Sequence, residues 1–264
     1  MQRLLGNILK METLEEKNAH IRDKDIVKDV DFLTNHKYFV RGDPNYISVS
    51  KFVKSFFPEF NNKEVIAKNY AKWQKDTKSK YYGLTPKQIL TLWHEKMRTS
   101  SENGTNIHKQ IEEYLNYLLI PSHSQPEFEY FLEFVKDYTQ NLENYRVEMT
   151  IFDEESKICG TLDMLYRKPN GKYILVDWKT SKDIVKFNMY GFGFYPLAHI
   201  SDCNYMHYSL QLNLYKYILE KHYGLEIQDL WIVQLREENK KYNVIECEDL
   251  QNEIKTMLDW KCNQ

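Results

Sequence analysis

The chain has 264 residues, a formal net charge of −2 and four cysteines. A chain of this length can bury a substantial core, so we expect one large domain or a core with an insertion or cap. The near-neutral charge excludes a surface that is basic throughout, but it is compatible with a local basic groove. Without a run of about 18 apolar residues, no membrane span is expected.

The cysteines and the first residues bear on where the protein works. The cysteines, at positions 159, 203, 247 and 262, show no C-x-x-C spacing. This spacing excludes a zinc module and favours free thiols in a reducing compartment. The opening segment MQRLLGNILK is too polar and too short for a secretory signal. We therefore expect an intracellular protein of the cytoplasm, nucleus or mitochondrion, and not a secreted one.

The first half of the chain has the pattern of helices. Residues 1–40 are polar with weak periodicity and predict an irregular or partly helical lead-in. A short strand is expected at 47–50, where Ser50 could cap a helix that ends before Pro58. Further helices are predicted over 63–75, from 86 to about 97, over 105–118 and over 127–142, with a polar break at 100–106.

Strand patterns begin near residue 144. We predict strands at 145–151, 158–167, 172–180, 230–235 and 242–246, a long loop at 184–204, and helices at 205–222 and 250–260. Helices followed by strand–strand–strand–helix–strand predict an α/β fold, with a small mixed sheet flanked by helices and an N-terminal helical cap.

The pair of strands at 158–180 carries charges where a buried strand would be apolar. Period-two alternation places Ile174, Val176 and Trp178 on one face, and Tyr173, Leu175, Asp177 and Lys179 on the other. The linking segment Pro169-Asn170-Gly171 has the residues of a hairpin turn. A turn centred on Asn170-Gly171 makes facing residue numbers sum to about 341, so Asp163 should lie across from roughly residue 178.

Asp163, Asp177 and Lys179 should therefore meet on one patch. Two neighbouring carboxylates favour a divalent cation or a shared proton, and hard oxygen ligands suit Mg²⁺ or Mn²⁺. A lysine beside them can orient water or stabilise charge on a phosphate. The alternative is a solvent-facing strand with an ordinary Asp–Lys ion pair.

Three motifs in sequence order resemble those of the PD-(D/E)XK nuclease superfamily, in its RecB-like branch. They are Gly160-Thr161-Leu162-Asp163, Asp177-Trp178-Lys179-Thr180-Ser181 and Gln211-Leu212-Asn213-Leu214-Tyr215. Upstream, Gly104 to His108 with Glu112 resembles the G-x-x-x-H…E helix of that branch. The run ILVDWKTSK followed by QLNLYKYI is most similar to the mitochondrial genome maintenance exonuclease group. The resemblance covers about residues 104–235, and Asp177 replaces the commoner glutamate of the E-x-K form.

The resemblance implies a role for each matching residue. His108, Asp163, Asp177 and the main-chain carbonyl of Trp178 would bind the metal, Mg²⁺ or Mn²⁺, with the histidine nitrogen favouring Mn²⁺. Lys179 would position or activate the attacking water, and Gln211 and Tyr215 would organise Lys179 or the scissile phosphate. Glu148 and Glu112 are candidates for an acid beside the metal or at a second metal. From residue chemistry we add Ser48, Ser50, Thr180, Ser181 and Lys182 as candidate contacts to DNA phosphates.

The implied division is a lead-in at 1–40, a helical cap at 41–142 that contributes to the active site, and a nuclease core at 143–264. The implied activity is metal-dependent hydrolysis of DNA phosphodiester bonds by an exonuclease. Its substrate would be single-stranded DNA with free ends, in replication, repair or recombination, with proteins of replication or recombination as partners. Two alternatives stay open: a structure-specific DNA endonuclease, and a catalytically silent DNA-binding scaffold on the same fold.

Overall fold

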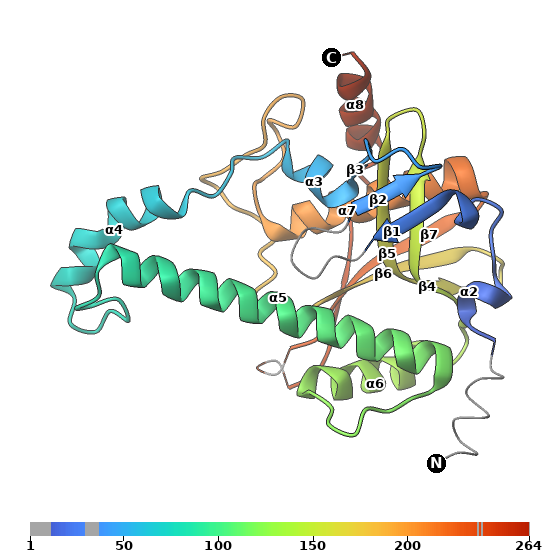
Figure 1. Cartoon of the computed structure of the whole chain (residues 1–264), viewed down its shortest axis with the longest axis horizontal. Coiled ribbons are helices and arrows are strands. Elements are labelled where there is room, and N and C mark those ends of the chain that lie inside the picture. The colour runs from blue at the N-terminus through green and yellow to red at the C-terminus, as the bar shows by residue number, and fades with distance from the viewer. Residues whose placement is uncertain (1–11, 30–36, 237, 239, 264) are drawn as a thin grey trace. The chain divides into compact units, whose positions relative to one another are not determined.

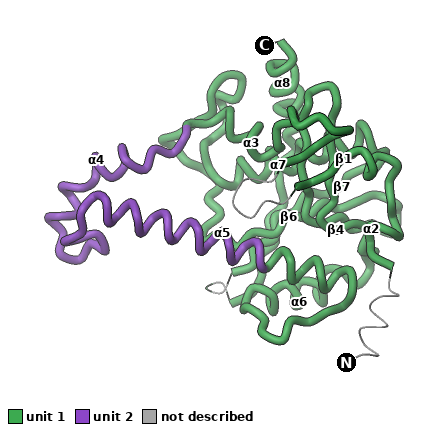
Figure 2. The backbone as a smooth tube through the Cα atoms, viewed as in Figure 1, with its two compact units in different colours: residues 1–58, 107–264 green, residues 59–106 purple. Residues whose placement is uncertain are grey.

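The computed structural model describes residues 12–29, 37–236, 238 and 240–263. The chain divides into two compact units, one of residues 59–106 and one of residues 1–58 with 107–264 (Figure 2). The segment MQRLLGNILK, which we predicted not to be a secretory signal, lies outside the described residues.

The smaller unit is a helical hairpin. It contains α4 (Asn62–Lys75) and the first part of α5 (Pro86–Tyr117). The two helices are joined by an aromatic cluster, in which the ring of Tyr81 lies 4.5 Å from that of Trp73 and 6.1 Å from that of Trp93. The indole N–H of Trp93 also donates a hydrogen bond to the hydroxyl of Tyr81 at 2.8 Å. Aromatic packing thus stabilises a unit whose helices bury few other side chains.

Helix α5 runs without interruption through residues 100–106, so the predicted polar break there is wrong. Serine, asparagine and Gly104 signal a loop, yet glycine within a helix costs only about 1 kcal/mol relative to alanine. The polar side of the helix is supported by an ion pair between Arg98 and Glu102 at 2.8 Å, one turn apart. Gly104 and His108 therefore lie on one continuous helix.

The larger unit is built around a six-stranded mixed sheet (Figure 1). Its strands are β3 (Ile47–Ser48), β4 (Glu143–Asp153), β5 (Ile158–Arg167), β6 (Tyr173–Lys179), β7 (Ile227–Gln234) and β8 (Asn243–Glu246). The strand order is β3-β5-β6-β7-β8, with β4 also paired to β5; the β3–β5 and β6–β7 pairs are parallel and the others antiparallel. The unit's helices are α2 (Leu14–Lys17), α3 (Val49–Lys54), the last part of α5, α6 (Pro126–Tyr138), α7 (Asn204–Ile218) and α8 (Gln251–Cys262), with a 3-10 turn at Asp23–Asp25 and a π-helical turn at Leu219–Tyr223.

Both faces of the sheet are covered, and β6 shows this directly. Ile174, Val176 and Trp178 lie in one core, beneath α5 and α6. Tyr173 and Leu175 lie in the other, beneath α3, α7 and α8. The predicted α/β fold and the predicted division of β6 into two faces are confirmed. The solvent-facing alternative is wrong, because Asp177 is only 2% exposed.

The turn between β5 and β6 has three residues, not two. The N–H of Gly171 donates to the carbonyl of Lys168 at 2.9 Å, and Gly171 has a φ of +81°. Pro169 thus occupies the second position of a type I turn, and glycine takes the left-handed position after it. Met164 faces Val176 in the last residue pair of these strands, so facing residue numbers differ by one from the predicted sum of about 341.

The N-terminal region is more regular than predicted. Where we expected an irregular lead-in, β1 (Ile26–Asp29) and β2 (Lys37–Val40) form an antiparallel pair. Their apolar side chains pack on the sheet through Phe152 and Cys159. The segments IVKD and KYFV are too short for their alternation to indicate strands in a charge-rich sequence. The pair is stabilised by contacts with residues more than 100 positions later in the chain.

Two predictions about the next segment also need correction. Ser48, not Ser50, caps α3, since the Ser48 Oγ accepts from the N–H of Lys51 at 3.3 Å. A separate helical cap over 41–142 is not evident among the described residues. Helices α3 and α6 pack on the sheet, and the predicted boundaries at 40 and 142 do not coincide with those of the two compact units.

The cysteines are free thiols, two of them buried, at Cys159 and Cys203. None of the helices in the described ranges is long and apolar enough to cross a membrane.

Candidate metal centre

At one point along β4 and β5, the apolar side chains switch from one core to the other. Two predicted site residues lie at this point. On β4, Met149 packs in the core under α7 while Val147 packs in the core under α6. On β5, Leu162 and Met164 are divided in the same way. In a regular strand, residues two apart share a face, so both strands must bend between these pairs. The residues at the bend are Glu148 and Asp163.

The bend requires an unusual backbone at Glu148. Its φ is +47°, in the left-handed region that non-glycine residues rarely adopt. Such a conformation costs about 1–3 kcal/mol and persists only where surrounding contacts impose it. The carboxylate of Glu148 lies close to that of Asp163 and to the ring of His108 as a result.

Three side chains converge at this bend. The Nδ1 of His108 lies 3.4 Å from Glu148 Oε1 and 3.6 Å from Asp163 Oδ1. One ligand atom from each of the three residues lies within 4.8 Å of the others. The other oxygen of Asp163 accepts a hydrogen bond from the N–H of Trp178 at 2.8 Å, which fixes the carboxylate relative to β6. The predicted residues His108, Glu148 and Asp163 are thus brought together.

The second nitrogen of His108 contacts β6. Its Nε2 lies 3.2 Å from the main-chain carbonyl oxygen of Trp178. A proton on Nε2 would donate to this oxygen and leave the Nδ1 lone pair directed at the carboxylates. The carbonyl predicted as a metal ligand is therefore engaged by the imidazole in this arrangement. The buried indole of Trp178 holds that segment through ring contacts with Phe131 and Phe134 at 5.5 and 5.4 Å.

Asp177 belongs to a second, adjoining group. Its Oδ2 lies 2.6 Å from the ammonium of Lys179, and its Oδ1 accepts from the amide of Gln211 at 3.1 Å. Both side chains predicted to act with Asp177 therefore contact it. Gln211 connects α7 to the carboxylate, which places Asp177, Lys179 and Gln211 in one hydrogen-bonded row beside Asp163.

The charges of the two groups are interdependent. Burial disfavours a charge on His108, but Asp163 and Glu148 outweigh it and raise its pKa to about 9. Burial raises the pKa of Asp163 to about 7. The charge of His108 acts against this rise, and the charge of Asp177 adds to it. For Lys179, burial is likewise outweighed by Asp177 and Asp163, so its pKa lies above the ordinary value. In the metal-free protein the imidazole and the ammonium are both cationic at neutral pH.

The raised pKa of His108 predicts how stability depends on pH. Its value of about 9 exceeds the ordinary 6.5, so the folded protein holds a proton that the unfolded chain releases. This contribution is fully present below about pH 6.5 and is lost as pH rises through about 9. We expect the free energy of unfolding, from urea titrations in EDTA, to fall relative to that of His108→Gln over this range. A difference between the two proteins that stays constant with pH would rule out the pairing.

Tyr215 contacts β5, and its predicted role in organising Lys179 or the scissile phosphate stays a prediction. Its buried hydroxyl donates to the main-chain carbonyl of Thr161 at 2.8 Å, beneath the strand that carries Asp163. A Cβ atom on Gly160 would lie 2.8 Å from Cε1 of the Tyr215 ring. Gly160 and the ring of Tyr215 therefore pack directly against each other, and this contact sets the distance between β5 and α7.

Replacing Gly160 by alanine should destabilise the protein by about 1–3 kcal/mol, because the added methyl group overlaps the Tyr215 ring. Tyr215→Phe, which keeps the ring and loses one hydrogen bond, should cost only about 1 kcal/mol. The measurement is the urea midpoint of each variant. In a Tyr215→Leu background the cost of the alanine should shrink, and an unchanged cost would show that the overlap is not its cause.

The other predicted residues have contacts of their own. Burial, together with the charge of Glu148, raises the pKa of the half-buried Glu112. Ser181 is anchored through its hydroxyl, 2.9 Å from that of Tyr208, and its carbonyl accepts from Gln234. Lys182 is exposed. The remaining predicted phosphate contacts are Thr180, whose carbonyl accepts from Arg236, and Ser48 and Ser50, whose hydroxyls are 3.4 Å apart.

Three residues at the site were not predicted. The ammonium of Lys179 lies 4.7 Å from the ring centroid of Tyr208. Tyr208 precedes Gln211 by three residues on α7, and this helical spacing is a signal that could have identified it. Lys28, 3.7 Å from Glu148 Oε2, and Tyr38, 2.9 Å from the Thr161 hydroxyl, come from β1 and β2. No local signal connects those two strands to the site.

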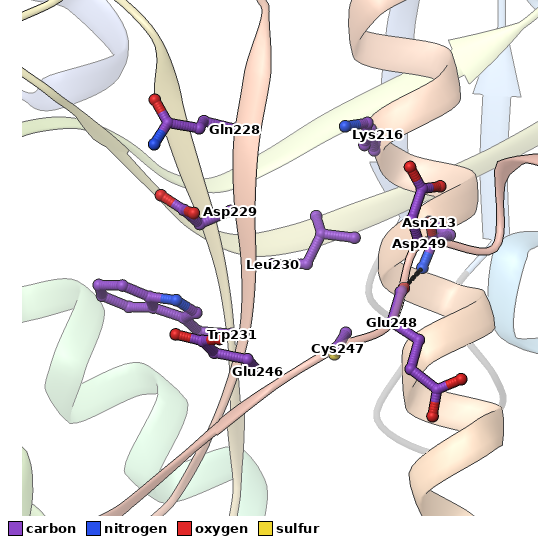
Figure 3. Close-up of a pocket in the computed structure, with 10 residues that line it drawn as sticks. All are labelled: Asn213, Lys216, Gln228, Asp229, Leu230, Trp231, Glu246, Cys247, Glu248 and Asp249. Carbon is purple, nitrogen blue, oxygen red and sulfur yellow. Dashed lines mark hydrogen bonds between the residues drawn. The ribbon is translucent and has the colours of Figure 1, made fainter.

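A separate pocket of about 120 Å³ lies between α7, β7 and the segment 246–249 (Figure 3). Asn213 crosses its wall with a hydrogen bond to the carbonyl of Glu248. Its charged lining is mainly acidic, with Asp229, Glu246 and Asp249 among the residues drawn. This pocket contains none of the predicted site residues, and its acidity is unsuited to a phosphate.

Comparison with known proteins finds no matching family model and no matching curated protein. Solved structures with a likeness to the chain include that of SSO0001, at 16% identity and a TM-score of 0.36, covering 98% of this chain and 84% of that one. Another is a protein from Eubacterium rectale described as a "putative exonuclease", at 11% identity and a TM-score of 0.38, covering 82% and 78%. At these scores neither likeness bears on what this chain does.

Proposed function

We propose that the protein is a metal-dependent deoxyribonuclease of the PD-(D/E)XK type that degrades single-stranded DNA from free ends. The observation that carries the proposal is the convergence of His108, Glu148 and Asp163 beside the buried pair Asp177–Lys179. His108, Asp163, Asp177 and Lys179 belong to the sequence motifs that resemble the RecB-like branch. Glu148 was predicted only as a candidate acid beside the metal.

The donor set fits a divalent cation such as Mg²⁺ or Mn²⁺. Each ligand of Mg²⁺ lies about 2.1 Å from the ion, so two ligands on opposite sides are about 4.2 Å apart and neighbouring ligands are closer. The His108 nitrogen lies 3.4 and 3.6 Å from the nearest carboxylate oxygens, within that limit. Two carboxylates and one imidazole offer hard oxygens with a nitrogen that suits Mn²⁺. We assign the metal to His108, Asp163 and Glu148, with Asp177 as a further ligand; the predicted Trp178 carbonyl is left out because it lies 3.2 Å from the other imidazole nitrogen, Nε2. When bound, the cation would supply charge to stabilise a phosphate and to acidify a water.

The protein's own groups have separate tasks in this proposal. Asp163 and Glu148 hold negative charge at the bend, and His108 must release its proton from Nδ1 before that nitrogen can act as a ligand. Gln211 keeps Asp177 in place through the hydrogen bond to its Oδ1. Tyr215 acts on β5 and not on the reacting atoms, so we regard it as a positioning residue.

Lys179 acts as a cation in this proposal. Because its pKa lies above the ordinary value, the ammonium stays protonated at neutral pH and is a poor proton acceptor. Its remaining protons can be donated to a phosphate oxygen or to the attacking water, which stabilises the charge that builds up in the transition state. Of the two roles predicted for Lys179, positioning the attacking water is kept, and activating it by accepting a proton is replaced by stabilising charge.

A nucleic-acid substrate is further supported by the distribution of charge. The smaller unit, residues 59–106, carries nine Lys or Arg residues and five Asp or Glu residues, a formal charge of +4 in a chain of −2 overall. Basic segments attract phosphates at a distance and increase the rate of association. We therefore place DNA, and not a small phosphate ester, as the substrate.

The proposal is tested with an end-labelled linear single strand beside a covalently closed single-stranded circle, each with Mn²⁺ or EDTA. We expect Mn²⁺-dependent shortening of the linear strand and no cleavage of the circle. Cleavage of the circle would favour the endonuclease alternative. Failure to cleave either substrate at any Mn²⁺ concentration would favour the silent scaffold and contradict the proposed function.

A further inference from the structure

The loop between β6 and α7 exposes an unusual set of aromatic rings. Of the eight exposed aromatic side chains in the described part of the chain, five lie on this one loop. They are Phe187, Tyr190, Phe192, Phe194 and Tyr195, and we call residues 184–203 the aromatic loop. Tyr190 is 92% exposed and Tyr195 is 77% exposed. Apolar surface gathered in this way on a water-exposed segment marks a binding surface.

The loop holds its rings outward by a fixed backbone. Its two sides are joined by hydrogen bonds from the N–H of Gly193 to the carbonyl of Ile200 at 2.9 Å and from Asp202 to Gly191 at 2.8 Å. Leu197 and Ile200 point inward and are buried in the core under α7. A Cβ at Gly193 would lie 2.7 Å from the carbonyl oxygen of Leu197, so only glycine permits this close approach. The exposed rings therefore belong to an ordered surface.

The aromatic loop is connected to the candidate site at both ends. It follows the strand that carries Lys179 and leads into the helix that carries Gln211. At its base the N–H of Val185 donates to the side chain of Asn204 at 2.8 Å. Lys182, just before the loop, and Lys186, within it, are exposed, and the ammonium of Lys186 lies 5.2 Å from the ring centroid of Tyr205. Flat rings and exposed ammonium groups thus occur close together in the chain.

We propose that the aromatic loop stacks the unpaired bases of single-stranded DNA while Lys182 and Lys186 contact the phosphates. Every base has a flat face, so aromatic rings beside basic groups bind single strands without regard to sequence. A protein partner would require no such combination of exposed rings with exposed lysines, and duplex DNA would not present its base faces. The inference rests on the proposed function only in taking the strand that the loop binds to be the strand that the site cleaves.

The test is the affinity for a fluorescent oligothymidylate, measured by anisotropy in EDTA so that no cleavage occurs. An abasic oligonucleotide of the same length serves as the matched ligand without bases. For Tyr190→Ala combined with Tyr195→Ala, we expect the Kd for oligothymidylate to rise about tenfold or more. The Kd for the abasic strand should stay unchanged. Tyr190→Phe with Tyr195→Phe, which keeps both rings, and Ile120→Ala, at an exposed apolar residue elsewhere, should bind like the wild type.

Three results would overturn the proposal. One is an unchanged affinity of the double alanine variant for oligothymidylate, and another is an equal loss for both ligands, which would leave no role for the bases. The third is a wild-type dimer in light scattering that the double variant abolishes without loss of DNA affinity, which would assign the rings to a second copy of the chain. Ring-dependent binding without Mn²⁺-dependent cleavage would leave this inference standing and contradict the nuclease proposal alone.

Discussion

Lys179→Ala is expected to lower the rate of Mn²⁺-dependent cleavage at least about a hundredfold. Removing one donor that stabilises transition-state charge in a buried site commonly has an effect of this size. The ammonium of Lys179 is buried beside Asp177 and stays charged at neutral pH, so its removal takes a fixed positive charge from the site. The measurement is a single-turnover rate on an end-labelled single strand, which separates the chemical step from binding.

The control for this variant is Lys255→Ala, at an exposed lysine on α8, which should cleave like the wild type. Removing Lys179 also leaves the carboxylate of Asp177 without its ion-pair partner, so the variant should be less stable. Rates are therefore compared at a temperature where circular dichroism shows both proteins folded. A folded Lys179→Ala variant that cleaves at more than about a tenth of the wild-type rate would contradict the role we assign to the lysine.

Asp163→Asn should weaken Mn²⁺ binding and lower the rate of cleavage while the fold persists. The substitution removes one of the two carboxylates at the bend, and loss of a single ligand should weaken Mn²⁺ binding at least about tenfold. The variant removes a carboxylate whose pKa burial raises to about 7, and His108 loses one of its two carboxylate partners in the same step. Because these effects oppose each other, the free energy of unfolding in EDTA at pH 8 should stay close to that of the wild type.

This combination of lost activity and retained stability distinguishes a functional carboxylate from a structural one. Titration calorimetry with Mn²⁺ gives the affinity, and urea unfolding in EDTA gives the stability. Asp259→Asn, at an exposed residue of α8, is the matched control and should change neither quantity. If Asp163→Asn lost stability but still bound Mn²⁺ with wild-type affinity, Asp163 would be a structural residue.

The parts of the fold that follow from local pattern could be predicted. Period-two alternation on β6 separates two buried faces, so Val176 and Leu175 could be assigned to opposite cores from the sequence. The hairpin pattern predicted that β5 and β6 pair, with a register error of one residue. That error arose because a two-residue and a three-residue turn use the same residues, and only the left-handed φ of Gly171 distinguishes them.

The features that depend on distant contacts could not be predicted. The bend at Glu148 arises because β4 and β5 leave one core and enter the other, and nothing in the residues next to Glu148 signals a positive φ. Lys28 reaches Glu148 from a strand more than 100 residues earlier in the chain. The helix through Gly104 was divided wrongly because its composition resembles a loop. Its buried side continues at Ile107, and local composition does not show that this residue packs against the sheet.

The central claim is that His108, Glu148 and Asp163 hold a divalent cation. The most direct measurement is an anomalous difference map from a crystal of the protein soaked in Mn²⁺. We predict a peak between the Nδ1 of His108 and the carboxylates of Glu148 and Asp163, and no peak there in a matched Asp163→Asn crystal. A fully occupied Mn²⁺ in the acidic pocket beside Asp229 and Glu246, with none at His108, would contradict the account.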